Sequence, residues 1–582
     1  MRGISFLIRG VYMQKHSIWR ALSIFQTLCA VLVIAVCPSG VLMAEQNRAA
    51  QEESVQPLPP LPPLPLSLVE KAEKDGTALR LSLKDVTKLA LTKNLDIAIQ
   101  DTNEGLSRQA IIQAKGSYDP TITLALGVQS QKSPNTNLAT ESLLGNYSTM
   151  DYANWNFTIQ QNVRTGGSYS ANLNSNRTDS NVGFLLFSPQ YNAGTTFTFT
   201  QPLWRNLRID QNRGQIKLAN LDLKMNDSQF KAKVVDIIAN VQGQYWDLVG
   251  AIRDYEIKRE SVRLAQTTLR DNIRKAEIGT LAAITVTEAR ATLAQREGDM
   301  ITAEEKISDA ENALLTMISS DRKEEIWSQV IVPAETPDYQ EYKVDYGAAV
   351  ETALKNRPEL EQSYITSNKY DINQKVNEES RKWQFDLKGT FGTTGVAGPQ
   401  SYITNPITGQ REVLIDPSMV GGIGNAYKLL FNGGFTNWAV SFNVQIPVLN
   451  RTVAAQIAEV KIQKRQELMK RKSIEQQIQA DIRNAAQKIE TNRKLVESAR
   501  AATAYAQEQL IGEQKRFEGG VSENFRVLDR QANYSAAQGA ELQALISYKK
   551  SIIAFQKAEY TLLDSNDFVT ATNATNRKPD FK

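Results

Sequence analysis

Residues 474–510 read IEQQIQADIRNAAQKIETNRKLVESARAATAYAQEQL, and this stretch decides the fold. Its apolar residues recur at steps of three, four and seven, as at Ile474, Ile478 and Ile482, on an otherwise polar segment. This spacing predicts a helix with one apolar face. No proline interrupts residues 448–578, as an unbroken helix requires. A helix from about residue 450 to 517 would be ~100 Å long at 1.5 Å per residue.

A helix of that length needs neighbours to cover its apolar face. Residues 203–332 form a second stretch without proline, so we expect paired antiparallel helices that pack as coiled coils. Gly279 and Gly519-Gly520 interrupt the two helical patterns. Because glycine adopts the left-handed conformation that ends helices, each break predicts a reversal into a helical hairpin.

Three short segments recur in the same order in the two halves of the chain. Residues 90–97 resemble 353–360, residues 201–203 resemble 446–448, and residues 275–279 resemble 516–520. The order predicts two copies of one unit of roughly 240–260 residues. We therefore divide the chain into a signal peptide (1–44), a Pro-rich segment (45–79), a first repeat (80–335), a second repeat (336–565) and a C-terminal tail (566–582).

Between its short and long helices, each repeat carries sequence that alternates between polar and apolar residues. Residues 121–126, 196–200 and 437–442 alternate in this way, and residues 383–387 do so more weakly. Period two with one apolar face is typical of half-buried strands. Residues 155–159 and 169–173 form another alternating pair around Gly166-Gly167. That pair is either a further hairpin of the sheet or a surface loop.

The N-terminal residues have the features of an export signal. Four basic residues accompany an apolar run from about residue 21 to 36, followed by small residues around Ala44. A retained anchor is the alternative, although the run is shorter than the ~20 residues of a spanning helix. Cys37 lacks the small preceding residue of a lipidation site. The prolines of residues 57–65 predict an extended spacer, with a docking segment as the alternative.

Removal of residues 1–44 would also remove Cys29, Cys37 and His16, which are the only cysteines and histidine of the sequence. The remaining chain could use neither thiolate nor imidazole catalysis, nor the commoner zinc and copper ligand sets. We therefore expect no enzyme, no cofactor and no metal site. The same cleavage leaves 63 basic against 63 acidic residues, so the charge gives no support for nucleic-acid binding.

No apolar run after the signal is long enough for a membrane helix, so a membrane-spanning form of this chain would use strands. Strands in lipid must close into a barrel, because an open edge leaves backbone groups unpaired. Membrane barrels need at least about eight strands, whereas one chain offers four, or six with the extra hairpin. Closure therefore requires several copies, and three chains of four strands would supply twelve.

Several segments resemble the TolC-like outer-membrane efflux proteins. Residues 81–94 resemble the opening helix of that family, residues 200–206 its strand-to-helix junction, and residues 275–290 and 516–531 its two periplasmic turns. The resemblance implies a mainly α fold with β structure, in which long antiparallel coiled-coil helices form a periplasmic α-barrel below a trimeric transmembrane β-barrel. It implies a homotrimer in the outer membrane of a Gram-negative-type envelope, in contact with outer-membrane lipid. Its partners would be a periplasmic adaptor and an inner-membrane transporter.

The resemblance also implies roles for residues at the turns. The adaptor-contact tips would be Gly279, Thr280 and Leu281 in the first hairpin and Gly520, Val521 and Ser522 in the second. Thr285 and Arg526 occupy the positions where the family commonly has an acidic residue at the periplasmic aperture, while Glu288 and Asp529 keep a later acidic position. Ordinary surface charge is the alternative for all four aperture positions.

Two other classes of protein remain as alternatives. A coiled-coil stalk of the envelope would explain the long helices but not the strands. A glycoside hydrolase needs only two suitably placed carboxylates, yet no such pair stands out among acids that alternate with bases on helix faces. We interpret the basic cluster of Lys461, Lys464, Arg465, Lys470, Arg471 and Lys472 as the polar face of a helix, with polyanion or lipid contact as the alternative.

Overall fold

The computed structural model describes residues 63–135, 146–181, 186–400, 402–404, 407–413 and 415–563. The expected signal peptide, most of the polyproline run and the C-terminal tail lie outside these residues, as do Cys29, Cys37 and His16.

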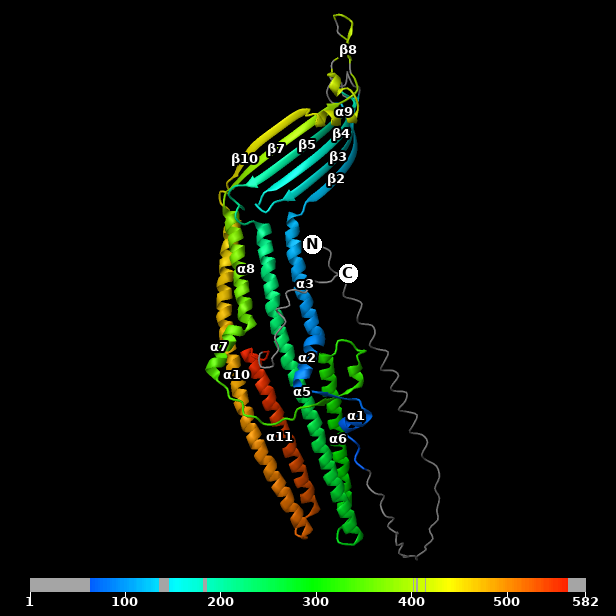
Figure 1. The fold of residues 1–582 in the computed structure, drawn as a ribbon, viewed down its shortest axis with the longest axis vertical. Coiled ribbons are helices and arrows are strands. Elements are labelled where there is room, and N and C mark those ends of the chain that lie inside the picture. The colour runs from blue at the N-terminus through cyan, green and yellow to red at the C-terminus, as the bar shows by residue number, and fades with distance from the viewer. Residues whose placement is uncertain are drawn as a thin grey trace, which may run out of the picture. The chain divides into compact units, whose positions relative to one another are not determined.

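Two long helical hairpins contain the four longest helices of the described chain. α5 (Gln211–Glu277) and α6 (Ala283–Ile318) make the first, and α10 (Arg451–Glu518) and α11 (Asn524–Glu559) the second. The 68 residues of α10 span ~100 Å, so the predicted helix over residues 450–517 is confirmed. Both hairpins extend away from the sheet, and their turns lie at the far end (Figure 1).

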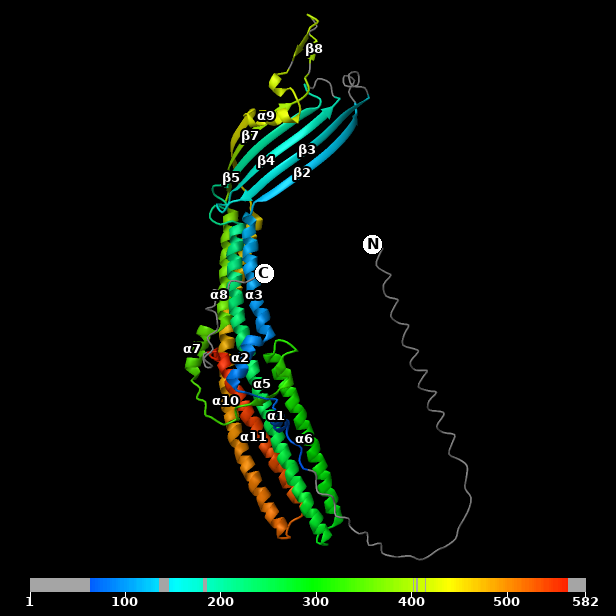
Figure 2. The ribbon, with the colours of Figure 1, turned by 45° about the vertical axis from the view of Figure 1, so that its right-hand side comes forward.

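Shorter helices repeat in the same way. α2 (Leu83–Lys93) and α3 (Leu95–Lys115) precede the first group of strands, and α7 (Tyr346–Asn356) and α8 (Pro358–Arg381) precede the second. The recurring segments 90–97 and 353–360 contain the two junctions. Asn94 caps α3 by accepting the N–H groups of Asp96 and Ile97, and Pro358 begins α8. α3 and α8 pack along α5 (Figure 2).

Six antiparallel strands form one sheet in the order β10-β7-β5-β4-β3-β2. The strands are β2 (Thr121–Pro134), β3 (Tyr147–Asn162), β4 (Ser168–Ser180), β5 (Gln190–Pro202), β7 (Gln384–Ala397) and β10 (Phe435–Gln445). Every strand predicted from alternation is present. The hairpin at residues 155–173 is part of the sheet as β3 and β4, and it turns at Gly166, whose φ is +86°. One chain therefore contributes six strands to this sheet.

The two faces of the sheet differ sharply. Directly paired residues share a face, so the register Ile122↔Ile159↔Ala171↔Phe197↔Phe391↔Trp438 runs across one apolar face. Ile122, Phe197, Phe391 and Trp438 are exposed there in the single chain. The opposite face carries amides and hydroxyls, with hydrogen bonds such as that from Asn192 Nδ2 to Asn176 Oδ1, which is 2.8 Å long.

Three asparagines of the polar face stand directly opposite glycines. The pairs are Asn154 with Gly127, Asn174 with Gly194, and Asn437 with Gly392. A Cβ built on these glycines would lie 2.5, 2.7 and 2.3 Å from the amide oxygens of Asn154, Asn174 and Asn437 respectively. Each asparagine side chain therefore lies over the neighbouring strand, in space that a larger residue would occupy.

Smaller elements complete the fold. α1 (Leu68–Asp75) precedes β1 (Ala78–Leu81), which pairs in parallel with β6 (Val330–Pro333) and so joins the start of the first repeat to its end. Between β7 and β10 lie the short pair β8 (Tyr402–Thr404) and β9 (Arg411–Val413), followed by α9 (Ile423–Phe431). Single 3₁₀ turns occur at Gly116–Tyr118, Glu325–Ser328 and Pro417–Met419.

The apolar stripe quoted at the outset forms a core between the helices. Ile478, Ile482, Ile489 and Val496 are almost fully buried and pack with residues of α7 and α11. Among the described helices, none combines the length and the apolar character needed to cross a bilayer.

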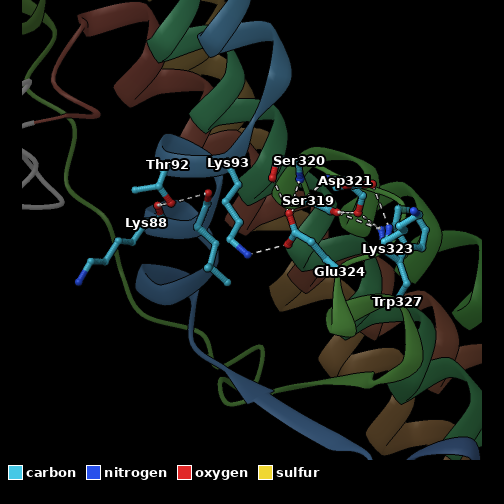
Figure 3. Close-up of polar contacts among 10 residues, drawn as sticks. Lys88, Thr92, Lys93, Ser319, Ser320, Asp321, Lys323, Glu324 and Trp327 are labelled. Atoms are coloured by element: carbon cyan, nitrogen blue, oxygen red, sulfur yellow. Dashed lines mark hydrogen bonds and ion pairs between the residues drawn. The ribbon is translucent and has the colours of Figure 1, made fainter. Parts of the chain in front are cut away.

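A polar clasp holds α2 against the segment that follows α6 (Figure 3). Glu324 accepts a 2.6 Å ion pair from Lys93 Nζ, and its other oxygen accepts the backbone N–H of Ser320 at 2.9 Å. The hydrogen bonds from Lys93 and Ser320 lower the pKa of Glu324 to about 2. The clasp is therefore fully formed at neutral pH.

Candidate functional site

The first hairpin turns within five residues after α5. Gly279 has a φ of +75°, its N–H donates to Ala276 O at 3.0 Å, and the Thr280 N–H donates to Lys275 O at 2.9 Å. This pair of bonds is the Schellman motif, which requires a left-handed residue at the position of Gly279. The Thr280 hydroxyl also donates to Lys275 O. The predicted helix reversal at Gly279 is confirmed.

The second hairpin repeats the same turn. Gly520 has a φ of +76° and donates to Phe517 O at 3.2 Å, while the Val521 N–H donates to Arg516 O at 3.0 Å. The hydroxyl of Ser522 donates to the carboxylate of Glu513, which is buried. Of the three expected contact residues, Val521 is therefore free to meet a partner, whereas Ser522 is engaged in holding its own turn.

Apolar side chains project from both turns. Ile278 and Ile284 flank the first turn and are 74% and 65% exposed, and Val521 and Phe525 of the second are 81% and 67% exposed. The two turns also contact each other, because Lys275 Nζ lies 4.0 Å from the ring centroid of Phe517. Together the hairpin ends present four exposed apolar groups on a rigid base.

The expected aperture residues lie just beyond the turns. Arg526 and Asp529 are exposed in the first two turns of α11, and Thr285 and Glu288 occupy the matching places in α6, with Thr285 half-buried. Each pair is three residues apart, so its members lie on one helix face. Asp529 accepts a hydrogen bond of 3.1 Å from Asn533 Nδ2. The structure thus brings the four positions to the same end of the hairpins; their role at an aperture stays a prediction.

A buried polar contact joins the two hairpins close to their turns. Asn272 Nδ2 of α5 donates to Asn524 Oδ1 of α11 at 2.9 Å, and both side chains are buried. The remaining amide atoms, Asn272 Oδ1 and Asn524 Nδ2, have no partner. Two turns away, Gln531 Nε2 donates to Thr268 Oγ1 at 3.0 Å. Sequence reasoning missed these residues. The available signal was the spacing of Asn524, Gln531 and Ser535, which are seven and four residues apart and therefore lie on the buried face of α11.

The basic cluster lies along α10, as interpreted from the sequence. Lys464 forms an ion pair with Asp371 of α8, and the guanidinium of Arg471 lies 3.9 Å from the ring centroid of Tyr364. Two members of the cluster thus bind a neighbouring helix. In the described part of the chain, no group of three or more His, Cys, Asp or Glu side chains is arranged to hold a metal ion.

Residues 162–320 match the sequence model of the family described as outer membrane efflux protein. The match spans β4, β5 and the whole first hairpin, including its turn. We find no significant sequence match to a curated protein.

Solved structures share the fold over most of the chain. The Campylobacter jejuni CmeC outer membrane channel superposes with a TM-score of 0.56 at 16% identity, over 82% of this chain and 86% of CmeC. The Neisseria gonorrhoeae MtrE outer membrane channel superposes with a TM-score of 0.53 at 17% identity, over 82% of this chain and 88% of MtrE. The outer membrane protein VceC from Vibrio cholerae superposes with a TM-score of 0.55 at 12% identity, over 82% of this chain and 95% of VceC.

The sequence match covers β4, β5 and the hairpin that carries the first turn, and the fold shared with CmeC covers 82% of the chain. The predicted fold class is confirmed by these structures, and the expected resemblance to the TolC-like outer-membrane efflux proteins is supported by the family match over residues 162–320.

Proposed function

We propose that this protein is the exit duct of a tripartite efflux or type I secretion system, a passive conduit across the outer membrane and the periplasm. The observation that carries the proposal is the direct continuation of strands with an apolar face into ~100 Å helices, as β10 leads into α10. A coiled-coil stalk would have no use for that apolar strand face.

The unpaired edges of the sheet favour an assembly of several copies of the chain. Its edge strands β2 and β10 have no partner on their outer sides within the described chain. Because six strands alternate in direction, β10 of one copy and β2 of the next are antiparallel and can pair without a break in the pattern. Three copies in a homotrimer supply eighteen strands, whereas the sequence led us to expect twelve from four strands per chain. Cylinders of 16–18 strands leave an aqueous channel.

The two faces of the sheet fit this arrangement. The apolar face would contact outer-membrane lipid, since polar groups in hydrocarbon cost several kcal/mol each. The amide-rich face would line the duct. No covalent chemistry is required of the chain, because energy for transport would come from an inner-membrane transporter.

The hairpin ends are the proposed contact for a periplasmic adaptor. Exposed Ile278 and Ile284 flank the turn at Gly279–Leu281, and exposed Val521 and Phe525 lie in and beside the turn at Gly520–Ser522. We assign Thr285, Glu288, Arg526 and Asp529 to the periplasmic aperture, because all four lie on the returning helices next to these ends.

Paired substitutions on one strand test the proposal. Leu124 lies on the apolar face of β2 and Thr123 on the polar face, and both are exposed in the single chain. The cost of a lysine at a lipid-facing position rises with depth and reaches about 2–4 kcal/mol at the bilayer midplane, so Leu124→Lys should reduce the yield of detergent-resistant trimers. Thr123→Lys should assemble and conduct in planar bilayers. A wild-type chain that is monomeric in detergent and leaves liposomes impermeable would refute the proposal.

A further inference from the structure

The short helix α9 lies on the apolar face of the sheet, at the end of the strands away from the long helices (Figure 1). Ala426 and Leu430 of α9 are buried against Ala193 and Ala397. A Cβ built on Gly395 would lie only 1.9 Å from the carbonyl oxygen of Ala426. The backbone of α9 therefore touches β7 directly, and the helix is fixed to the sheet.

α9 begins where the exposed apolar part of its strands ends. Moving along β5 away from the long helices, exposed Phe199 and Phe197 come first, then Thr195, and then Ala193 beneath α9. On β7, Phe391 is followed by Thr393, whose hydroxyl lies 2.8 Å from that of Thr195. The two hydroxyls mark the border between the bare apolar face and the region that α9 covers.

The same border is visible on β3. Phe157 and Trp155 belong to the apolar face, and Asp151 lies on that face four residues farther toward the strand end. The Trp155 ring stacks on Tyr427 of α9 with centroids 6.2 Å apart, and Tyr427 stacks on Phe431 at 6.4 Å. In outer-membrane proteins, aromatic residues concentrate at the two edges of the apolar band, where hydrocarbon meets the headgroup layer. The contact between Trp155 and α9 lies at such an edge.

The exposed side chains of α9 combine apolar and basic groups. Ile423 is 40% exposed and Phe431 is 73% exposed, and Lys428 between them is exposed as well. A fixed helix that shows an aromatic ring and an aliphatic side chain beside a cation has the composition of a membrane-interface helix.

We propose that α9 is an interfacial helix that binds the lipid of the outer leaflet. Ile423 and Phe431 would contact the acyl chains, and Lys428 would contact anionic lipid headgroups. The inference rests on the proposed function, because it takes the apolar face of the sheet as lipid-facing. Lipid is favoured over a second copy of the chain because α9 continues that face, and because lysine is depleted in contacts between proteins.

Spin labels at three positions test the inference in the full chain carrying Cys29→Ala and Cys37→Ala, which removes the native cysteines. Phe431→Cys reports on α9. Trp438→Cys, on the bare apolar face and 76% exposed, is the hydrocarbon reference. Val521→Cys, at a hairpin turn and 81% exposed, is the water reference. In phosphatidylcholine vesicles containing phosphatidylglycerol, collision rates with oxygen and with a water-soluble nickel chelate give the depth of each label.

We expect the label at 431 to lie between the two references in its ratio of oxygen to nickel collisions. A ratio equal to that at 521 would place α9 in water and overturn the inference. A label at 431 shielded from both reagents would indicate contact with a second copy and would also overturn it. If the label at 438 lacks the hydrocarbon signature, the proposed function fails, whatever the result at 431.

Charge reversal tests the headgroup contact separately. Lys428→Glu combined with the label at 431 should move the label toward water in vesicles with phosphatidylglycerol and leave it unchanged in pure phosphatidylcholine. If Lys428→Glu leaves the depth of the label at 431 unchanged in both kinds of vesicle, Lys428 does not contact the anionic headgroups. Tyr427 and the buried residues of α9 are untouched in this variant, so the helix itself is retained.

Discussion

The ammonium group of Lys275 lies 4.0 Å from the ring centroid of Phe517 and so joins the ends of α5 and α10. Both residues lie within the Schellman turns of their hairpins, where Phe517 O accepts the N–H of Gly520 and Lys275 O accepts that of Thr280. A cation–π contact at an exposed site is worth about 0.5–1 kcal/mol. The two turns therefore stabilise each other across the hairpins.

Phe517→Leu should loosen both turns together. Loss of about 0.5–1 kcal/mol corresponds to an increase of roughly two- to fivefold in local opening. Hydrogen exchange followed by mass spectrometry should show this increase in peptides covering residues 275–281 as well as 516–522. Phe525→Leu is the matched control, because Phe525 is 67% exposed. An increase confined to residues 516–522 would contradict the coupling.

Asn272→Leu should destabilise the protein more than the double variant Asn272→Leu/Asn524→Leu. The single change leaves the buried amide of Asn524 without its partner, at a cost of about 1–3 kcal/mol, whereas replacing both partners removes that penalty. Thermal unfolding of the purified protein, followed by circular dichroism, measures both variants. Equal losses in the single and double variants would show that the amide pair is not coupled.

The aperture assignment predicts changes in conduction. Asp529→Ala and Arg526→Ala should each alter single-channel conductance and ion selectivity in planar bilayers, because a charge at a constriction acts on every passing ion. Glu518→Ala, an exposed acid at the end of α10, is the control. Unchanged conductance and selectivity in both variants would remove Arg526 and Asp529 from the gate.

The clasp at Glu324 predicts a pH-dependent stability. Its pKa is about 2 in the folded protein against an ordinary 4.5, so its contribution is complete above about pH 4.5 and is lost as the pH falls toward 2. Glu324→Gln should therefore lower the melting temperature at pH 7, and the difference from wild type should shrink between pH 4.5 and 2. Glu325→Gln, at an exposed neighbour, should show no such trend. A difference that persists at pH 2 would exclude the ion pair as its cause.

The helices and turns were predictable because their signals are local. The stripe from Ile474 to Leu510 sets one face of α10, and the absence of proline permits its length. Gly279 and Gly520 each adopt the left-handed conformation for which glycine was expected. The strands were also predictable, since alternation at residues 121–126 and 437–442 depends only on which face is apolar.

The features that sequence reasoning missed depend on contacts between distant residues. Nothing in residues 423–431 alone indicates that α9 lies on the sheet; the contact depends on Gly395 and Ala193, far away in sequence. The hairpin at residues 155–173 remained ambiguous for the same reason, because β3 and β4 are defined by their pairing with β2 and β5. The contact between Asn272 and Asn524 likewise required the packing of α5 against α11.

The three asparagine–glycine pairs have a consequence for what the duct would admit. Because the amides of Asn154, Asn174 and Asn437 lie over glycines, these side chains would project little into a passage lined by this face. On this face of the described strands, Asp386 and Lys388 of β7 carry opposite charges near the helical end, and the remaining side chains are uncharged. Cations, anions and sugars would therefore all meet the same uncharged hydrogen-bonding groups on this face of the sheet. Sorting of cargo by charge would then take place before it reaches the strands.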